Sequence, residues 1–194
     1  GRLGPGHCVR LWSSAEQQRR QPFDPPELLE ADPVPLALQL ALWGSPLGEG
    51  LPWLTAPPRA GLEEARELLS QLDALNPAGQ LSSHGKAMGA LGLHPRLSHM
   101  LLRAAALGWQ ALAADLAVLL SERDPLDRQV VGSDLGTRLA WLEQHQPHLP
   151  PWQRLRKQRQ ALLDQLQRLP DHAAPTGGSA SSTAALDADR AALL

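Results

Sequence analysis

The sequence predicts a mainly α-helical protein. Leucine and alanine are abundant, whereas tyrosine is absent and phenylalanine occurs once, so good helix formers outnumber the aromatic residues that favour strands. Leucines recur every three or four residues in several stretches, which is the spacing of one face of a helix. Eighteen prolines and sixteen glycines interrupt these stretches, so the helices are expected to be short.

Residues 1–24 are expected to be the end of a separate domain. Residues 7–12 alternate enough to form a strand, and Gly4-Pro5-Gly6 before them favours a turn. A lone strand is not stable in water, so we expect it to pair within a sheet whose other strands lie outside this sequence, with Cys8 buried there. The polar residues 13–21 are typical of a solvated connector.

The first helix of a second unit, residues 25–90, is predicted to begin at Asp32. Aspartate is a favoured N-cap, and Pro33 suits the first helical position. Apolar residues follow at helical spacing as far as Trp43, and Gly44 provides a stop. Trp43 is therefore expected to be a core residue.

A second helix and a small hairpin complete this unit. The helix follows Pro57-Pro58 and carries leucine and alanine on one face between residues 62 and 72. Residues 76–79 form a turn, and residues 80–82 a short extended segment. Helix, helix and hairpin is the order of a winged helix, so this module is predicted for residues 25–90.

Residues 91–172 are predicted to form a small helical bundle. Four stretches with one apolar face each are joined by short connections. The first opens at His94-Pro95 and the second at Trp109, whose ring is also expected in the core. The third spans about residues 134–145, and the fourth follows Pro150-Pro151.

Residues 173–194 are expected to be a flexible linker and the start of a further helix. Residues 173–183 are mostly small and polar, and the helix that follows them is cut short. The sequence also begins at Gly1 without an initiator methionine. We therefore expect this chain to be a segment of a longer protein.

Charge and cysteine content exclude several classes of protein. A net charge of −2 argues against an autonomous, strongly basic nucleic-acid-binding domain. Cys8 is the only cysteine, which excludes an internal disulfide and a cysteine-based zinc site and favours a reducing, cytoplasmic location. No apolar run approaches the ~20 residues of a membrane span, so no membrane partner is expected.

Four short stretches of the sequence keep a fixed order: residues 1–6 running into 9–12, residues 26–29 leading to 40–44, residues 92–97, and residues 119–126. Together they resemble the region that follows the second motor domain in DEAH-box ATP-dependent helicases, most closely the bacterial HrpB group. The resemblance covers roughly residues 1–130, and no reliable match is seen beyond them.

The resemblance implies a role for each part of the chain. Residues 1–24 would be the tail of the second RecA-like domain, residues 25–90 a winged helix, and residues 91–172 a ratchet-like helicase-associated bundle. The whole enzyme would use ATP and Mg²⁺ to move along single-stranded RNA and unwind duplexes. This sequence has neither a phosphate-binding loop nor an Asp-Glu-Ala-His run, so it should bind no cofactor and be inactive without the upstream motor domains.

Arg2 is the one candidate catalytic residue. The family's motor motif ends in Gly-Arg, and Gly1-Arg2 matches those two positions. The resemblance implies that Arg2 is an arginine finger, which stabilises the negative charge that develops on the γ-phosphate during hydrolysis. The alternative is an ordinary exposed arginine near the end of the chain.

Two groups of basic residues are candidates for contact with nucleic acid. Arg96 and Arg103 share one helical face, on a helix that flanks the strand channel in the family. Arg154 and Lys157 belong to the densest basic cluster, next to Trp152, which is a candidate for base stacking. Helix capping and surface ion pairs are the alternative for the first group, and a solvated helix face for the second.

Two other classes of protein remain open. The first is a regulator that binds nucleic acid through a winged helix. It would need a basic recognition helix, but the helix near residues 62–75 carries four acidic residues, Glu63, Glu64, Glu67 and Asp73. A helical scaffold that binds only protein is the other alternative. Such a scaffold should show no affinity for RNA even at low salt.

Overall fold

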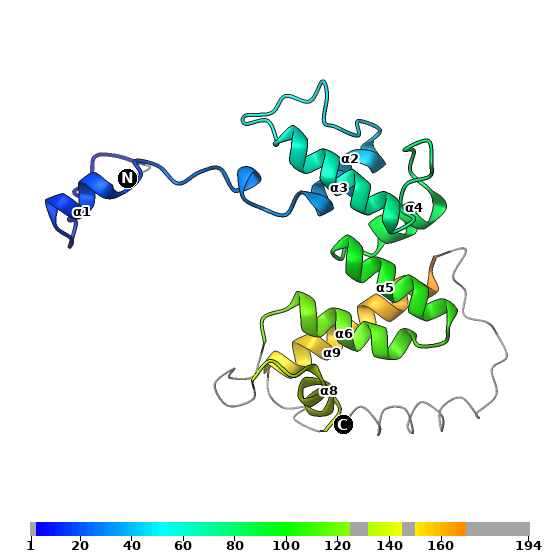
Figure 1. Cartoon of the computed structure of the whole chain (residues 1–194). Helices are drawn as coiled ribbons and strands as arrows, with labels where there is room; N and C mark the ends of the chain where they lie inside the picture. Colours follow the sequence, from blue (N-terminus) through cyan, green and yellow to red (C-terminus); the bar gives the residue numbers. More distant parts are fainter. Residues whose placement is uncertain (1–2, 125–131, 145–149, 170–194) are drawn as a thin grey trace.

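The computed structural model describes residues 3–124, 132–144 and 150–169, and it confirms a mainly helical fold (Figure 1). The described part contains helices and one isolated antiparallel bridge, and no longer strand. In chain order the elements are α1 (Ser14–Arg19), the 3-10 turn η1 (Glu27–Leu29), α2 (Pro33–Trp43), α3 (Arg59–Gln71), α4 (Ser83–Ala90), α5 (Pro95–Ala106), α6 (Gln110–Ser121), α8 (Leu135–Gln144) and α9 (Pro150–Gln167).

The N-terminal segment differs from its prediction. Residues 7–12 do not form a strand, and Cys8 is exposed, because no other segment of the described chain pairs with this backbone. The residues expected to be a connector instead form α1, which Ser13 caps by accepting a hydrogen bond from the backbone N–H of Glu16. Figure 1 shows α1 apart from the other helices, and none of its residues is buried.

Helix α2 has the predicted ends but a different buried face. Asp32 accepts a hydrogen bond from the backbone N–H of Val34, and Gly44 ends the helix in the left-handed conformation, with φ 89°. The buried face is centred on Val34, Ala37 and Leu38 and packs on α3. Trp43 lies on the opposite side of the helix and is 77% exposed, so the prediction that it is a core residue was wrong.

The predicted hairpin is reduced to a single antiparallel bridge between Leu75 and Leu81. The turn between them is closed by the backbone of residues 76–80, and Gly79 has φ 74°. Ser82 then caps α4, a helix that the sequence analysis did not identify separately. Helix α4 runs so close to the bridge that a Cβ atom on Gly85 would collide with the carbonyl of Ala74.

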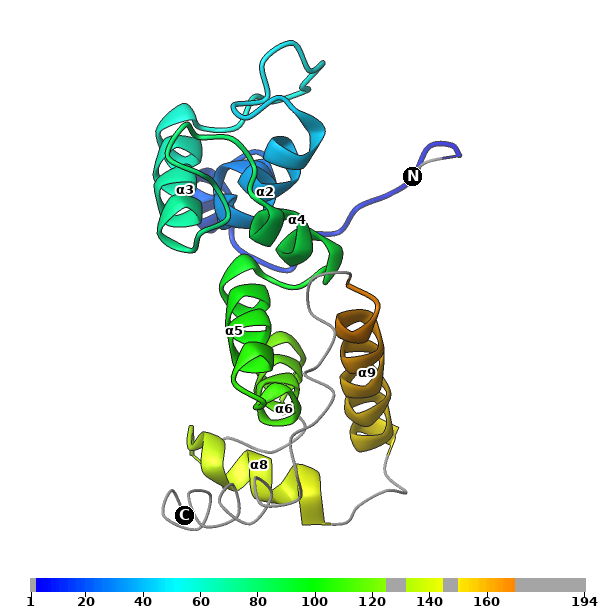
Figure 2. The same cartoon turned by 90° about the vertical axis from the view of Figure 1, so that its right-hand side faces the viewer.

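Helices α5, α6, α8 and α9 form the predicted bundle. Helix α6 packs against α5, α9 and α8, and its small apolar residues allow close approach. Trp109 precedes α6 at its N-cap position and is 45% exposed, so it is not the core residue that was predicted. Figure 2 shows α5 and α6 side by side, with α9 along one side and α8 across the end.

Helix α5 connects the bundle to the preceding helices α2, α3 and α4. Helix α5 packs against α4 and α2. Nδ1 of His99 in α5 lies 2.9 Å from the carbonyl oxygen of Leu72, which follows α3, and 3.0 Å from Nε2 of His84 in α4. Because a carbonyl oxygen only accepts, Nδ1 of His99 carries the proton in its contact with Leu72. The start of the bundle is therefore bonded to the end of α3.

Candidate nucleic-acid interface

The outer face of α5 carries two exposed arginines, Arg96 and Arg103. The buried residues of this helix, among them Leu101 and Leu102, lie on the other side. Arg103 follows Arg96 by seven positions, which is close to two full turns and places the two side chains almost in line along the helix axis. Within the described chain neither arginine has a carboxylate at ion-pair distance, although Arg96 interacts electrostatically with Asp32 at a longer range. Both guanidinium groups therefore keep their hydrogen-bond donors for an anion.

Apolar side chains flank these arginines on the same face. Met100 is half-buried, and Leu107, just after the helix, is 72% exposed. The face therefore alternates positive charge with apolar surface. This combination suits single-stranded nucleic acid, which presents phosphates and unpaired bases together.

A cavity of about 780 Å³ lies beside the N-terminal end of α5. Its walls come from the turn before α5, from the end of α6 and from α9, and they are largely apolar. Arg96 lines this cavity together with Glu122 and Gln158. The cavity thus lies between Arg96, one of the predicted contacts on α5, and the polar side chains of Glu122 at the end of α6 and Gln158 on α9.

The basic cluster of α9 is largely used to hold that helix in place. Arg159 binds Asp115 of α6, with Nε 2.5 Å from Oδ1, and Asp115 is buried. Arg154, one of the predicted nucleic-acid contacts, forms an ion pair with Glu122 at the end of α6. Lys157 is exposed and has no ion-pair partner among the described residues, so of the two predicted contacts on α9 it is the more available.

Glu122 connects α6 to α9 through both of its carboxylate oxygens. Oε2 accepts from Arg154, and Oε1 accepts from Nε2 of Gln158 at 2.5 Å. The hydrogen bond from Arg154, followed by that from Gln158, lowers the pKa of Glu122 below its usual value. The carboxylate is therefore stabilised in its charged form, and the seam between the two helices stays polar.

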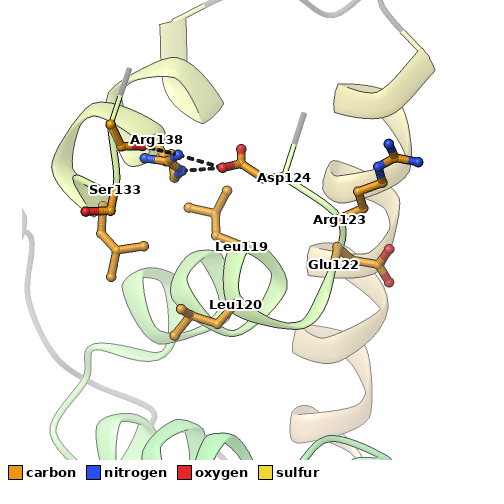
Figure 3. Close-up of a pocket in the computed structure, with 9 residues that line it drawn as sticks. Leu119, Leu120, Glu122, Arg123, Asp124, Ser133 and Arg138 are labelled. Carbon is orange, nitrogen blue, oxygen red and sulfur yellow. Dashed lines mark hydrogen bonds and ion pairs between the residues drawn. The ribbon is translucent and has the colours of Figure 1, made fainter. Parts of the chain in front are cut away.

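A second cavity, of about 790 Å³, lies between the end of α6 and α8 (Figure 3). Arg138 at its wall is 5% exposed and donates through Nε and Nη2 to Oδ2 of Asp124, at 2.8 and 2.6 Å. It also donates to the carbonyl oxygens of Gly132 and Asp134. All three nitrogens of this guanidinium are occupied, so Arg138 holds the start of α8 in place.

The remaining predicted site residues have different outcomes. Arg2 lies outside the described residues. Trp152 is buried at 4% exposure, so the hypothesis that it stacks on a base was wrong. No group of three or more His, Cys, Asp or Glu side chains in the described part could hold a metal ion. No described helix is both long and apolar enough to span a membrane.

Known proteins with a similar sequence are ATP-dependent RNA helicases. No protein-family model matches the chain. The ATP-dependent RNA helicase HrpB of Escherichia coli is 34% identical over 158 residues, which are 81% of this chain and 18% of that protein. The ATP-dependent RNA helicase HrpA of E. coli is 30% identical over 135 residues, which are 66% of this chain and 10% of that protein.

Solved structures agree with the sequence relatives. A crystal structure of the E. coli DExH-box NTPase HrpB matches with a TM-score of 0.63 and 33% identity over 85% of this chain and 19% of that one. A second crystal structure, of the E. coli DEAH/RHA helicase HrpB, matches with a TM-score of 0.67 and 34% identity over 86% of this chain and 20% of that one.

The extent of the match corrects one prediction and fixes the family. Similarity to HrpB spans 158 residues, more than the roughly 130 expected from the sequence. The chain spans about a fifth of the length of the HrpB proteins that it matches. It belongs to the HrpB group of DEAH-type ATP-dependent RNA helicases and corresponds to part of their C-terminal region.

Proposed function

We propose that this chain is the accessory C-terminal region of a longer ATP-dependent RNA helicase, which couples ATP hydrolysis to the unwinding of RNA. The observation that carries the proposal is the outer face of α5, where Arg96 and Arg103 lie in line with no carboxylate of the described chain at ion-pair distance. On a chain with a net charge of −2, two such arginines on one face form a local anion-binding surface. The similarity to HrpB, an ATP-dependent RNA helicase, supports RNA as that anion.

The nucleotide would bind outside this chain. The sequence has no phosphate-binding loop. ATP and Mg²⁺ would therefore be held by upstream RecA-like motor domains. Arg2 would reach that site as an arginine finger and stabilise charge on the γ-phosphate.

The chain would divide into the parts predicted from the sequence. Residues 1–24 would complete the second motor domain, residues 25–90 would form the winged helix, and residues 91–172 the ratchet-like bundle, followed by a linker at residues 173–194. The contacts of α5 with α2 and α4 support joint movement of the winged helix and the bundle. The single cysteine, Cys8, fits a cytoplasmic helicase.

An RNA titration of the longer protein tests the α5 surface. Replacing Arg96 and Arg103 by alanine should weaken binding of single-stranded RNA. It should also reduce the slope of log K against log salt concentration by about 1.4, because each phosphate contact that is lost no longer releases counterions from the RNA. Arg59→Ala is the matched control, since Arg59 is exposed on α3 but pairs with Glu63. It should leave both quantities unchanged.

The same titration separates the helicase from a helical scaffold that binds only protein. A helical scaffold would bind no RNA at low salt, and a wild-type protein that behaves in this way contradicts the proposal. If the double variant instead bound RNA as tightly as wild type, RNA would run elsewhere and the role of α5 would be wrong.

A further inference from the structure

A pair of stacked tryptophans joins α8 to α9. The rings of Trp141 and Trp152 are nearly parallel, with 19° between their planes and 6.4 Å between their centroids. Trp152 is buried on α9, whereas Trp141 on α8 is 42% exposed. The buried ring therefore fixes the orientation of the exposed one.

The exposed side of Trp141 is a preformed aromatic surface. In the described chain, Trp152 supplies its only ring contact, and no cation lies over its ring. A tryptophan that is already stacked on one side loses little rotamer freedom when a second flat group stacks on the other. Binding there costs less entropy than binding to a free side chain.

A positive charge lies beside this surface. Arg156 follows Trp152 by one helical turn on α9, so both side chains face α8. Nη2 of Arg156 donates to the carbonyl oxygen of Leu142, the residue next to Trp141, at 3.2 Å. The guanidinium of Arg156 is thereby held at the backbone of the residue that follows Trp141.

Arg156 differs from its neighbours in the basic cluster. Arg154 and Arg159 bind the carboxylates of Glu122 and Asp115. Arg156 has no carboxylate partner within the described residues, and its hydrogen bond to Leu142 uses a single nitrogen. The charge of Arg156 is therefore available to an external anion, and exposed Lys157 adds a second charge next to it.

We propose that Trp141 and Arg156 form a subsite for single-stranded RNA, in which a base stacks on Trp141 and a backbone phosphate binds Arg156. An aromatic surface beside a cation is the combination that binds single strands without reading their sequence, because every base offers a flat face. The inference rests on the proposed RNA function and adds a second contact surface, distinct from α5. It assigns to Trp141 the stacking role expected of Trp152.

Binding of fluorescein-labelled oligouridylate to the longer protein tests the subsite. Trp141→Leu keeps an apolar side chain over Trp152 but removes the stacking surface, and it should weaken binding about fivefold to a hundredfold. Arg156→Gln keeps an N–H donor for Leu142 and should lower the salt slope by about 0.7. Trp43→Leu is the control, because Trp43 on α2 is more exposed than Trp141; this change should alter neither the affinity nor the salt slope.

Photo-crosslinking of the wild-type protein to bromouridine-substituted RNA provides evidence that does not depend on the fold of a variant. A crosslink at Trp141 supports the subsite, and the absence of any crosslink to α8 overturns it. Equal binding by Trp141→Leu and wild type also overturns it. If the wild-type protein does not bind RNA at all, the proposed function itself is contradicted. If the wild-type protein binds RNA and Trp141→Leu binds it equally well, only the subsite is overturned.

Discussion

Nε2 of His94 lies 2.9 Å from Oδ2 of Asp32, so the residue that caps α5 is bonded to the residue that caps α2. Nδ1 of His94 accepts from the backbone N–H of Arg96, which leaves the proton on Nε2 for Asp32. Oδ1 of Asp32 in turn accepts from the N–H of Val34. One contact thus links the starts of two helices that are far apart in sequence.

Asp32→Ala should destabilise the fold by about 1 kcal/mol, because α2 loses its N-cap. His94→Ala should remove the cap of α5 and the link to α2. Urea unfolding measures both changes. If the link matters beyond the two caps, the double variant will lose less than the sum of the single variants. Strict additivity would mean that each residue acts only on its own helix.

The Asp32 carboxylate also predicts a pH dependence. Its hydrogen bond from Val34, with a smaller contribution from His94, lowers the pKa of Asp32 below its usual value. A lowered folded-state pKa contributes stability above the unfolded value of about 3.9, and this stability is lost as pH falls through the folded-state pKa. Stability measured between neutral pH and pH ~3 should therefore fall less in Asp32→Ala than in wild type.

Arg138→Ala should be strongly destabilising. It removes a buried guanidinium and leaves the half-buried carboxylate of Asp124 without this partner, together with the carbonyls of the exposed residues Gly132 and Asp134. Breaking a buried ion pair by removing one partner costs about 3 kcal/mol or more. Chemical denaturation gives the value, and Arg59→Ala, at a fully exposed ion pair, should have little effect. Equal, small losses in the two variants would show that water screens the Arg138 pair.

Gly85→Ala tests the close approach of α4 to the bridge. A Cβ atom at this position would overlap the carbonyl of Ala74 and lie 2.8 Å from Cδ1 of Leu81, so a loss of about 1–3 kcal/mol is expected. Gly61→Ala in α3 is the matched control. Its Cβ would meet atoms at no less than 3.6 Å, and the change should stabilise the helix by up to about 1 kcal/mol. Similar melting temperatures for both variants would contradict this geometry.

Arg2→Ala tests the proposed arginine finger in the longer protein. Turnover of ATP should fall by about three orders of magnitude or more, with little change in nucleotide affinity, because the guanidinium acts on charge that develops during hydrolysis. Steady-state hydrolysis and binding of a fluorescent nucleotide give the two quantities. Unchanged turnover would assign Arg2 to an ordinary surface role.

The elements that could be predicted from the sequence depend on local chemistry. Asp32 and His94 each precede a proline, and both helices begin where that pattern places them. Helix α4 was not identified because its sequence, with Gly85, Lys86 and Gly89, has no clear apolar stripe. Its position is fixed by the close approach to Ala74, which is a tertiary contact.

The candidate site was harder to predict because its charges are paired over long distances. Arg159 finds Asp115 forty-four residues away, and Arg154 finds Glu122 thirty-two residues away. No local pattern distinguishes these arginines from Arg156, which has no such partner in the described chain. In the same way, Trp43 and Trp152 exchanged their expected places because the partner helix decides which face of a helix is buried.

The histidines of α5 have a mechanical consequence. His94 fastens the beginning of this helix to Asp32, and His99 fastens its middle to the chain after α3. Arg96 and Arg103 project from the same helix toward solvent. A force that a strand under tension exerts on those arginines would therefore be transmitted through the two histidine contacts to α2 and to the end of α3, rather than being absorbed within the bundle.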